Sequence, residues 1–282
     1  MPTDLPPPAP PREIVHAPYT ALAIGLMAGI TSSLLGVGGS VFLVPGMTYL
    51  LRVRQHRASG TSLAVMLSTA LLSALLYNRG AQLNSQPGLD MGVILWLALG
   101  GVAGAVLGAQ LSMRVPARRL RGLFGAFVAV TGVYMLLHGF LHLPQGQPHP
   151  NAMVRVLELV GVGVLTGALS GLLGVGGGVV MVPALVLLVG YTQHQAQGTS
   201  LAVIVMVSVS GALTHSLRGN VIWSLAAWMA IGSAVGALVV TPRVYAIPQE
   251  TLRAMFGIFM VLVGGIISSS RPKGETGEKP RG

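Results

Sequence analysis

The chain has no cysteine and few charged or aromatic residues. The absence of cysteine from all 282 residues excludes disulfide bonds, thiolate metal sites and cysteine nucleophiles. Aromatic residues make up 5%, which gives no sign of a cage around a large organic ligand. Charged residues make up 9%, whereas a soluble domain carries about 25%. Hydrophobic residues reach 52% and the mean hydropathy is +0.72, so the composition predicts an integral membrane protein.

Apolar stretches follow one another along most of the chain. Residues 18–51 and 153–190 are too long for one crossing, and both contain a glycine-rich interruption. The other stretches have the length of one helix that crosses about 30 Å of hydrocarbon at about 1.5 Å per residue. They are residues 58–77, 89–112, 119–142, 196–217, 220–240 and 248–269. We therefore predict an all-α protein of about eight full transmembrane helices, and up to ten segments if the two broken stretches are divided.

The interruption occurs twice, 138 residues apart. Leu34–Pro45 returns as Leu172–Pro183, and His56–Val65 returns as His194–Val203. Between Leu34 and Val65, 19 of 32 aligned positions are identical without gaps. This duplication indicates the two internal repeats that many transporters contain.

Glycines that recur every fourth residue mark the later part of each repeat. This spacing predicts close packing between membrane helices, and we assign it no other role. The residues concerned are Gly100, Gly104, Gly108, Gly232 and Gly236.

The repeats define the domain organisation. Residues 18–142 and 153–270 form two membrane repeats, and residues 143–152 form the connecting loop. Residues 1–17 are Pro-rich and lack the basic start, apolar core and cleavage site of a signal peptide, so we expect a disordered tail. Residues 271–282 form a basic polar tail.

Basic residues test the topology, because they gather in the cytoplasmic connections of membrane proteins. Five segments per repeat place 13 Lys and Arg on the side of both termini and 4 on the other side, whereas four segments give 9 and 8. The first arrangement is favoured, with both termini cytoplasmic and the repeats inverted. Because these basic residues lie between apolar spans, the excess of 17 Lys and Arg over 7 Asp and Glu does not indicate nucleic-acid binding.

The glycine-rich interruptions have two interpretations. Backbone that leaves a helix at membrane depth must be buried in protein or line a cavity. Glycine permits positive φ, and the next helical arm then begins with bare N–H groups and a dipole that favour an anion. The alternative is that glycine only allows tight packing, and the recurrence of a proline at the same distance favours the anion site. The glycines are Gly36, Gly38, Gly39, Gly174, Gly176 and Gly177.

Hydroxyl and guanidinium groups recur at the two ends of the next span. The hydroxyls of the repeated Gly-Thr-Ser-Leu-Ala either cap a helix start or donate to a ligand, and both roles suit a nearby anion. The arginine that ends the span either binds two oxyanion acceptors or anchors the helix at the membrane surface. The residues are Thr61, Ser62, Thr199 and Ser200 for the hydroxyls, and Arg79 and Arg218 for the guanidinium groups.

Histidines supply most of the titratable groups near the spans. His56 and His194 occupy equivalent positions, where they either bond at the interface or gate transport in response to protons. His215 and Glu158 are further candidates for proton coupling. Glu158 lies three residues after Arg155, and we expect these two to pair on one helix face.

The paired Gly-x-Gly-Gly-x-x-x-x-x-Pro and Gly-Thr-Ser-Leu-Ala blocks, in a small membrane protein with few acids, resemble the TauE/SafE family of prokaryotic sulfite exporters and sulfonate permeases. The resemblance covers about residues 20–270. It implies secondary transport of a small sulfur-containing or organic anion, such as sulfite, sulfoacetate or a short sulfonate, across the cytoplasmic membrane. It also implies that the glycines and hydroxyls of both copies form the site. Ser40 stands where the second copy has Gly178, so the two half-sites differ.

Other function classes have less support. A membrane enzyme needs a nucleophile, an acid–base pair or metal ligands at membrane depth, and Glu158 is the only acid near the interior of a span. His138, His142 and His149 could hold a metal, but no carboxylate joins them, and we expect neither metal nor cofactor. An anion channel is the main alternative, since paired broken helices can also line a pore.

Overall fold

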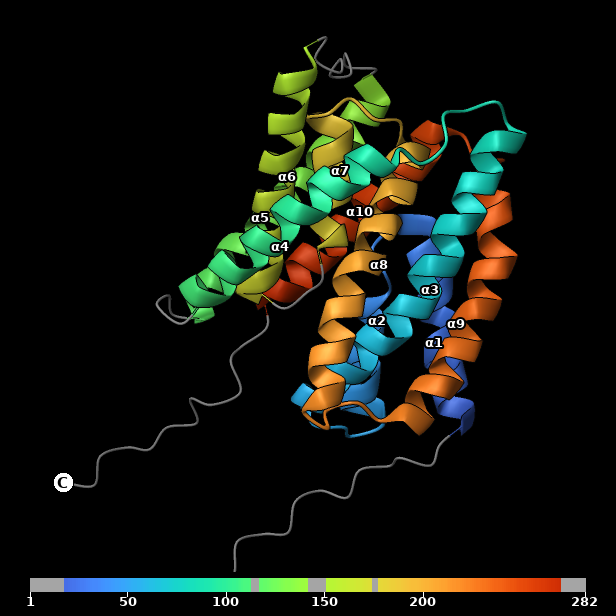
Figure 1. Ribbon diagram of the computed structural model, residues 1–282, viewed down its shortest axis with the longest axis vertical. Coiled ribbons are helices and arrows are strands. Elements are labelled where there is room, and N and C mark those ends of the chain that lie inside the picture. Colours follow the sequence, from blue (N-terminus) through green and yellow to red (C-terminus); the bar gives the residue numbers. More distant parts are fainter. Residues whose placement is uncertain (1–17, 113–116, 142–150, 174–176, 270–282) are drawn as a thin grey trace, which may run out of the picture.

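A computed structural model describes residues 18–112, 117–141, 151–173 and 177–269 of the chain. These ranges contain ten α-helices, one π-helical segment and no strand (Figure 1). Seven of the helices are long and apolar enough to cross a membrane. The predicted all-α architecture of an integral membrane protein is therefore confirmed.

The helices fall into two series of equivalent elements. The first comprises α1 (Pro18–Leu35), α2 (Ser40–Pro45), η1 (Gly46–Leu50), α3 (Gln55–Leu83), α4 (Met91–Ser112) and α5 (Ala117–Leu141). The second comprises α6 (Ala152–Leu173), α7 (Gly178–Leu187), α8 (Gln193–Leu217), α9 (Trp223–Val244) and α10 (Gln249–Ser269). Shorter apolar helical segments at residues 40–50, 122–137 and 178–187 accompany the seven long ones.

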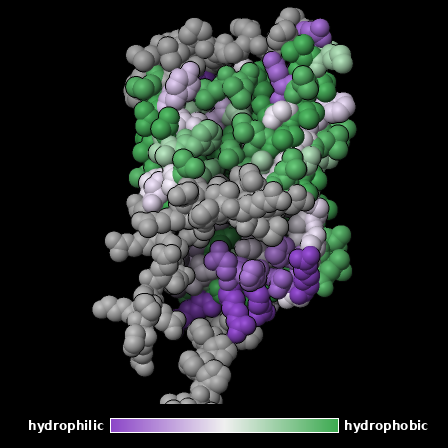
Figure 2. All heavy atoms as spheres, turned by 90° about the vertical axis from the view of Figure 1, so that its left-hand side faces the viewer, coloured by the Kyte–Doolittle hydropathy of each residue, from purple (hydrophilic) through white to green (hydrophobic). Residues whose placement is uncertain are grey.

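The outer surface carries large apolar side chains. Leu95, Leu99 and Val106 on α4 are each about half exposed. Figure 2 shows apolar residues over most of the upper body and hydrophilic residues gathered toward the lower end. A soluble protein rarely exposes an apolar surface of this extent, whereas hydrocarbon accommodates it. The surface therefore fits a protein embedded in a bilayer.

Helices pack across the two series. Helix α1 packs along α9, and α4 packs along α6 in the equivalent way. A Cβ on Gly29 would lie 2.2 Å from the Ser233 carbonyl oxygen, and a Cβ on Gly104 would lie 2.1 Å from the Val164 carbonyl oxygen. Glycine is thus required for these backbones to approach so closely, and the packing role predicted for the fourth-residue spacing is confirmed.

Equivalent helices of the two series lie antiparallel. A Cβ on Gly60, near the start of α3, would meet His215 near the end of α8. A Cβ on Gly198, near the start of α8, would meet Tyr77 toward the end of α3. In Figure 1, α1 accordingly rises from the lower end of the molecule and α6 descends from the upper end. Inverted repeats require this relation between equivalent helices.

The chain turns back on itself after α1. A Cβ on Gly39 would lie 3.0 Å from the Ala28 carbonyl oxygen, and a Cβ on Gly46 would lie 2.7 Å from Ile24. The segment α2–η1 therefore runs antiparallel to α1 and forms a helical hairpin with it. This segment exposes Tyr49 and Leu50 on its outer side.

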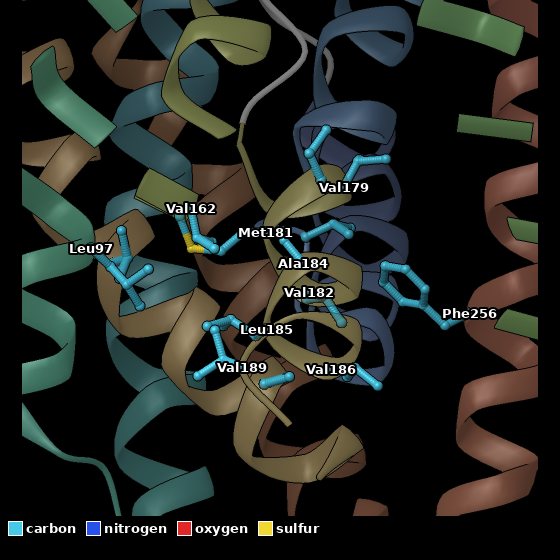
Figure 3. Packing of buried hydrophobic residues seen from close by; sticks show 14 of the residues in the cluster. Leu97, Val162, Val179, Met181, Val182, Ala184, Leu185, Val186, Val189 and Phe256 are labelled. Carbon is cyan, nitrogen blue, oxygen red and sulfur yellow. The ribbon is translucent and has the colours of Figure 1, made fainter. Parts of the chain in front are cut away.

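Helix α7, the equivalent of α2, lies inside the molecule. Its residues from Gly178 to Val186 are all buried. Figure 3 shows α7 surrounded by side chains that include Leu97 of α4, Val162 of α6 and Phe256 of α10. The two equivalent segments α2 and α7 therefore have different surroundings.

Candidate functional site

The first helix break, residues 36–39, has the left-handed backbone that glycine permits. Gly36, Gly38 and Gly39 have φ angles of 70°, 74° and 76°. The Gly36 N–H donates to Ser32 O (2.8 Å) and completes α1, and the Phe42 N–H is the first to donate back to Gly39 O (3.0 Å). N–H groups that precede this bond lie outside the helical hydrogen-bond ladder. The break therefore has the backbone geometry predicted for it.

Protein surrounds the first break on all sides. Val37 is completely buried, and the glycines beside it are buried as well. A Cβ on Gly36 would lie 2.8 Å from the Cα atom of Gln197 on α8, and a Cβ on Gly38 would lie 2.8 Å from the Met66 side chain on α3. The segment thus satisfies the requirement that irregular backbone at membrane depth be enclosed.

The start of α7 touches the first break directly. A Cβ on Gly178 would lie 2.6 Å from the Cα atom of Val37 and 2.9 Å from the Gly36 carbonyl oxygen. These are backbone atoms, so a side chain at this position cannot be accommodated by a rotamer change. The contact explains why the second copy has glycine where the first has Ser40.

The second helix break, residues 174–177, does not repeat the first in every detail. Gly177 has a φ of −63° and begins α7 in right-handed geometry, and its carbonyl oxygen accepts from the Met181 N–H (2.9 Å). The positive φ of Gly39 is therefore not repeated at its equivalent Gly177. Gly174 and Gly176 lie outside the described residues.

The four repeated hydroxyls do not cap helices. Helix α3 begins at Gln55, more than a turn before the hydroxyl pair, and α8 begins at Gln193. Thr192 is the N-cap of α8, because its hydroxyl accepts from the Gln195 N–H (3.3 Å) and its N–H donates to the Gln195 side chain (3.1 Å). The capping interpretation of Thr61, Ser62, Thr199 and Ser200 is therefore wrong. The first turn of each helix is polar, so the apolar stretches that begin at residues 58 and 196 predicted starts that are too late.

Three of these hydroxyls bond to backbone. Thr61 Oγ1 accepts from the Ile222 N–H at the start of α9 (3.0 Å). Ser62 Oγ donates to a carbonyl oxygen one turn back in α3 (2.8 Å). Ser200 Oγ donates to the Gly36 carbonyl oxygen (2.9 Å). The structure therefore brings Ser200 to the first break and uses Thr61 to hold α9 against α3.

A hydrogen-bonded layer that we call the central layer joins α3 and α8 to the end of α1. The Tyr77 hydroxyl lies 2.7 Å from Ser33 O and 2.8 Å from Gln197 Oε1. Gln197 Nε2 donates to Leu34 O (2.7 Å). Both side chains are buried, and the sequence analysis did not identify either of them. The central layer secures the residues that lead directly into the first break.

A cavity of about 250 Å³ lies next to the central layer, where α3 ends and α6 and α8 begin. In Figure 1 this region is at the upper end of the molecule, opposite the start of α1. Tyr77 belongs to both the cavity wall and the central layer, and Thr199 also lines the cavity. Polar side chains from several elements complete the lining: Asn78, Asp90, Arg155, Tyr191, His194, Gln195 and Tyr245.

Arg155 supplies the guanidinium group of this lining. Its charge acts on the Tyr191 phenol, and the structure has no ion pair between Arg155 and Glu158, both of which are described. The expected pairing is therefore wrong, because the arginine faces the cavity instead. Burial raises the pKa of Tyr191, although Arg155 lowers it in part, and burial raises the pKa of Tyr245 to about 12. Both phenols consequently remain protonated at neutral pH.

The equivalent histidines have different environments. His56 is exposed, whereas His194 is buried, lies 3.1 Å through Nε2 from Val244 O and stacks on Tyr245 with ring centroids 4.8 Å apart. His215 lies next to Gly60 at the opposite end of α8. Only His194 among these three lines the cavity.

Arg79 and Arg218 both have exposed side chains, and Arg218 is the C-cap of α8. Neither lines the cavity. We therefore expect Arg79→Lys and Arg218→Lys to transport at the parent rate, because a lysine anchors a helix end as well as an arginine does. Transport by each variant in proteoliposomes, compared at equal protein content, measures this. A loss of tenfold in either variant would assign that guanidinium to the substrate.

No group of three or more His, Asp or Glu residues is arranged to hold a metal within the described ranges. The side chains of His138, His142 and His149 lie outside them. Within the described residues, the groups that could hold an anion are therefore backbone, hydroxyl, amide, imidazole and guanidinium groups.

Comparisons with known proteins agree over nearly the full chain. A family model described as "Sulfite exporter TauE/SafE" matches residues 8–267. The chain is 27% identical to "Probable membrane transporter protein YunE" of Bacillus subtilis, over 86% of this chain and 94% of the relative. It is 28% identical to a "Probable membrane transporter protein" of Xylella fastidiosa, over 88% and 94%. It is 25% identical to "Probable membrane transporter protein MJ0441" of Methanocaldococcus jannaschii, over 86% and 94%.

Proposed function

Because the chain belongs to the TauE/SafE sulfite exporter family of membrane transporters, we propose that it is a secondary transporter of small sulfur-containing or organic oxyanions. The substrate class includes sulfite, sulfoacetate and short sulfonates. We place the protein in the cytoplasmic membrane of a prokaryote, where its partners are the lipid bilayer, the anion and protons. It needs no cofactor, catalyses no covalent reaction and binds no nucleic acid.

The meeting of the first break with the start of α7 carries this proposal. Gly178 abuts Val37 and Gly36, so the two broken segments come together in the interior of the molecule. Glycines with positive φ and the first N–H groups of the segment 40–50 supply backbone donors there. An anion is the ligand that such donors and a helix dipole favour. We therefore assign the transported anion to this junction at a stage of the cycle in which the surrounding helices open.

The central layer favours a carrier over an anion channel. Tyr77 and Gln197 bond to each other and to the backbone before the first break, and they separate the cavity from the break. A carrier needs such a closed layer on one side of its site in each state, whereas an open pore needs a continuous path. Movement of α3 relative to α8 would open the layer by separating Tyr77 from Gln197.

The proposed topology has ten segments, two inverted repeats and both termini in the cytoplasm. The antiparallel packing of α3 and α8 and the 13 to 4 distribution of basic residues support it. We expect a phosphatase or fluorescent reporter fused after residue 282 to show cytoplasmic exposure. Periplasmic exposure of that fusion in intact cells would contradict the inverted arrangement.

Transport in proteoliposomes tests the function itself. We expect saturable uptake of labelled sulfoacetate, with mutual competition among sulfoacetate, sulfite and thiosulfate, because the backbone and hydroxyl donors recognise the oxyanion head. Aromatic sulfonates with bulky rings should compete poorly. The measurements are initial rates with and without an imposed pH gradient, with empty liposomes as the control. Ion currents far above carrier turnover would instead support the channel, and transport of uncharged solutes alone would exclude an anion carrier.

A further inference from the structure

The cavity holds two buried nitrogen atoms that have no hydrogen-bond partner. Arg155 Nε and His194 Nδ1 are both inaccessible to solvent and unpaired, and both residues line the cavity. His194 as a whole is only 3% exposed. Buried polar nitrogens are normally satisfied, so two unsatisfied ones on residues of one cavity wall indicate that a hydrogen-bonding partner is missing there.

The hydrogen bond of His194 to Val244 fixes which ring nitrogen carries a proton. A carbonyl oxygen only accepts, so Nε2 must donate across its 3.1 Å contact with Val244 O. In the neutral ring Nδ1 is therefore a bare acceptor. It becomes a donor only when the imidazole takes up a second proton and acquires a positive charge.

We propose that this cavity is a binding site for a small oxyanion, separate from the helix breaks, in which Arg155 and the doubly protonated His194 hold the anion. The guanidinium group donates to the oxyanion through Nε, which has no other partner. The imidazolium donates from Nδ1, so one proton enters the site with the anion. This inference rests on the proposed function and gives the outer site of the same transport path.

Other charged and titratable groups also surround the cavity. Asp90, the carboxylate of the lining, accepts from the Gly92 N–H (2.8 Å) and the Val93 N–H (3.3 Å) through Oδ1 at the first turn of α4, but it keeps a negative charge that Arg155 and the protonated His194 must outweigh. Tyr245 stacks on His194 from the end of α9, Tyr77 approaches from α3, and Tyr191 precedes α8. These phenols are neutral at physiological pH, which leaves Arg155 and His194 as the groups that attract an anion.

A proton taken up with the anion has a measurable consequence. Binding and protonation of His194 must reinforce each other equally, because coupling between two ligands is reciprocal. Above the range in which a free histidine titrates, one coupled proton makes the association constant fall about tenfold per unit of pH.

Calorimetric titration of the purified full chain with sulfoacetate tests both contributions. This probe has no group that titrates near neutral pH, and two buffers of different ionisation enthalpy reveal the number of protons taken up. We expect close to one proton per anion for the parent at pH 7.5. We expect His194→Gln to bind without proton uptake or pH dependence, and Arg155→Gln to bind at least about tenfold more weakly, since a charged hydrogen bond is lost. Arg155→Lys should lose less affinity than Arg155→Gln. Arg243→Gln, which changes an exposed arginine outside the cavity, should bind sulfoacetate as tightly as the parent.

The outcomes separate this site from the break. Unchanged binding in Arg155→Gln, or unchanged proton uptake in His194→Gln, would overturn the cavity site and leave the break untouched. Full transport by a variant with a blocked first break, together with proton-coupled binding, would instead overturn the role of the break and keep the cavity. Thermal unfolding of each variant identifies those that fail to fold, and Arg155→Lys then provides the decisive comparison for the guanidinium.

Discussion

Gly38→Val is expected to abolish transport while the protein remains folded in the membrane. Gly38 has a φ of 74°, which a β-branched residue adopts only at a cost of about 1–3 kcal/mol. A Cβ there would also lie 2.8 Å from Met66 and 3.1 Å from Ile204, which approach from α3 and α8. The variant must therefore separate the two helices that enclose the break or give up the backbone that presents its N–H groups. The backbone strain alone corresponds to about a 5- to 150-fold loss in the population of the competent state.

Uptake of labelled sulfoacetate into proteoliposomes measures this effect, and membrane content by immunoblot corrects for expression. Gly161→Val is the matched control, because Gly161 lies within α6 with nothing within 4 Å of its Cβ position. We expect the control to transport like the parent. Equal transport by Gly38→Val would show that the first break is not the site.

Gly178→Ser is expected to reduce transport severely, whereas Ser40→Gly is expected to be mild. Positions 40 and 178 are equivalent in the two repeats, with serine at the first and glycine at the second. The two variants therefore exchange the same two residue types in two different surroundings. A side chain at position 178 meets the Val37 Cα atom at 2.6 Å and the Gly36 carbonyl oxygen at 2.9 Å, and neither backbone atom can move away without reshaping the first break. Removal of the Ser40 side chain creates no such collision.

Transport and thermal unfolding of both variants, measured side by side, check this asymmetry. We expect about a 5- to 150-fold loss of rate for Gly178→Ser, because overpacking against a fixed neighbour costs about 1–3 kcal/mol. Full activity of Gly178→Ser would mean that the junction between the breaks tolerates a side chain and is not shaped around a ligand.

Much of the fold was predictable because hydrophobicity and glycine act locally. The lengths of the apolar stretches predicted the helices. The glycine cluster that interrupts the first stretch permitted the positive φ seen at Gly36, Gly38 and Gly39. Gly177 shows the limit of this reasoning. Its sequence neighbourhood repeats that of Gly39 until Gly178 replaces Ser40, yet its φ is −63°, and the Gly178 that follows packs against the backbone of the first break.

The polar contacts of the site were not predictable from the repeat. Tyr77 and Gln197 bond to each other, but their equivalents are His215 and Ser59, so the pair is not duplicated and no repeated motif marks it. Arg155 was expected to pair with Glu158, because helix spacing relates only residues three or four apart, whereas Tyr191 lies in a connection of the second half. These contacts arise between elements that are distant in sequence, and local patterns do not encode them.

The exchange of helices between the two halves has a consequence for biogenesis. Helix α1 packs along α9 and α4 along α6, so neither half encloses its own first helix. During synthesis α1 must wait in the bilayer, its glycine face covered only by lipid, until nearly all of the chain has left the ribosome. Native contacts of such long sequence separation form late and leave intermediates exposed to wrong partners. A half-length fragment should therefore be a target for membrane proteases, and co-production of both halves should protect each of them.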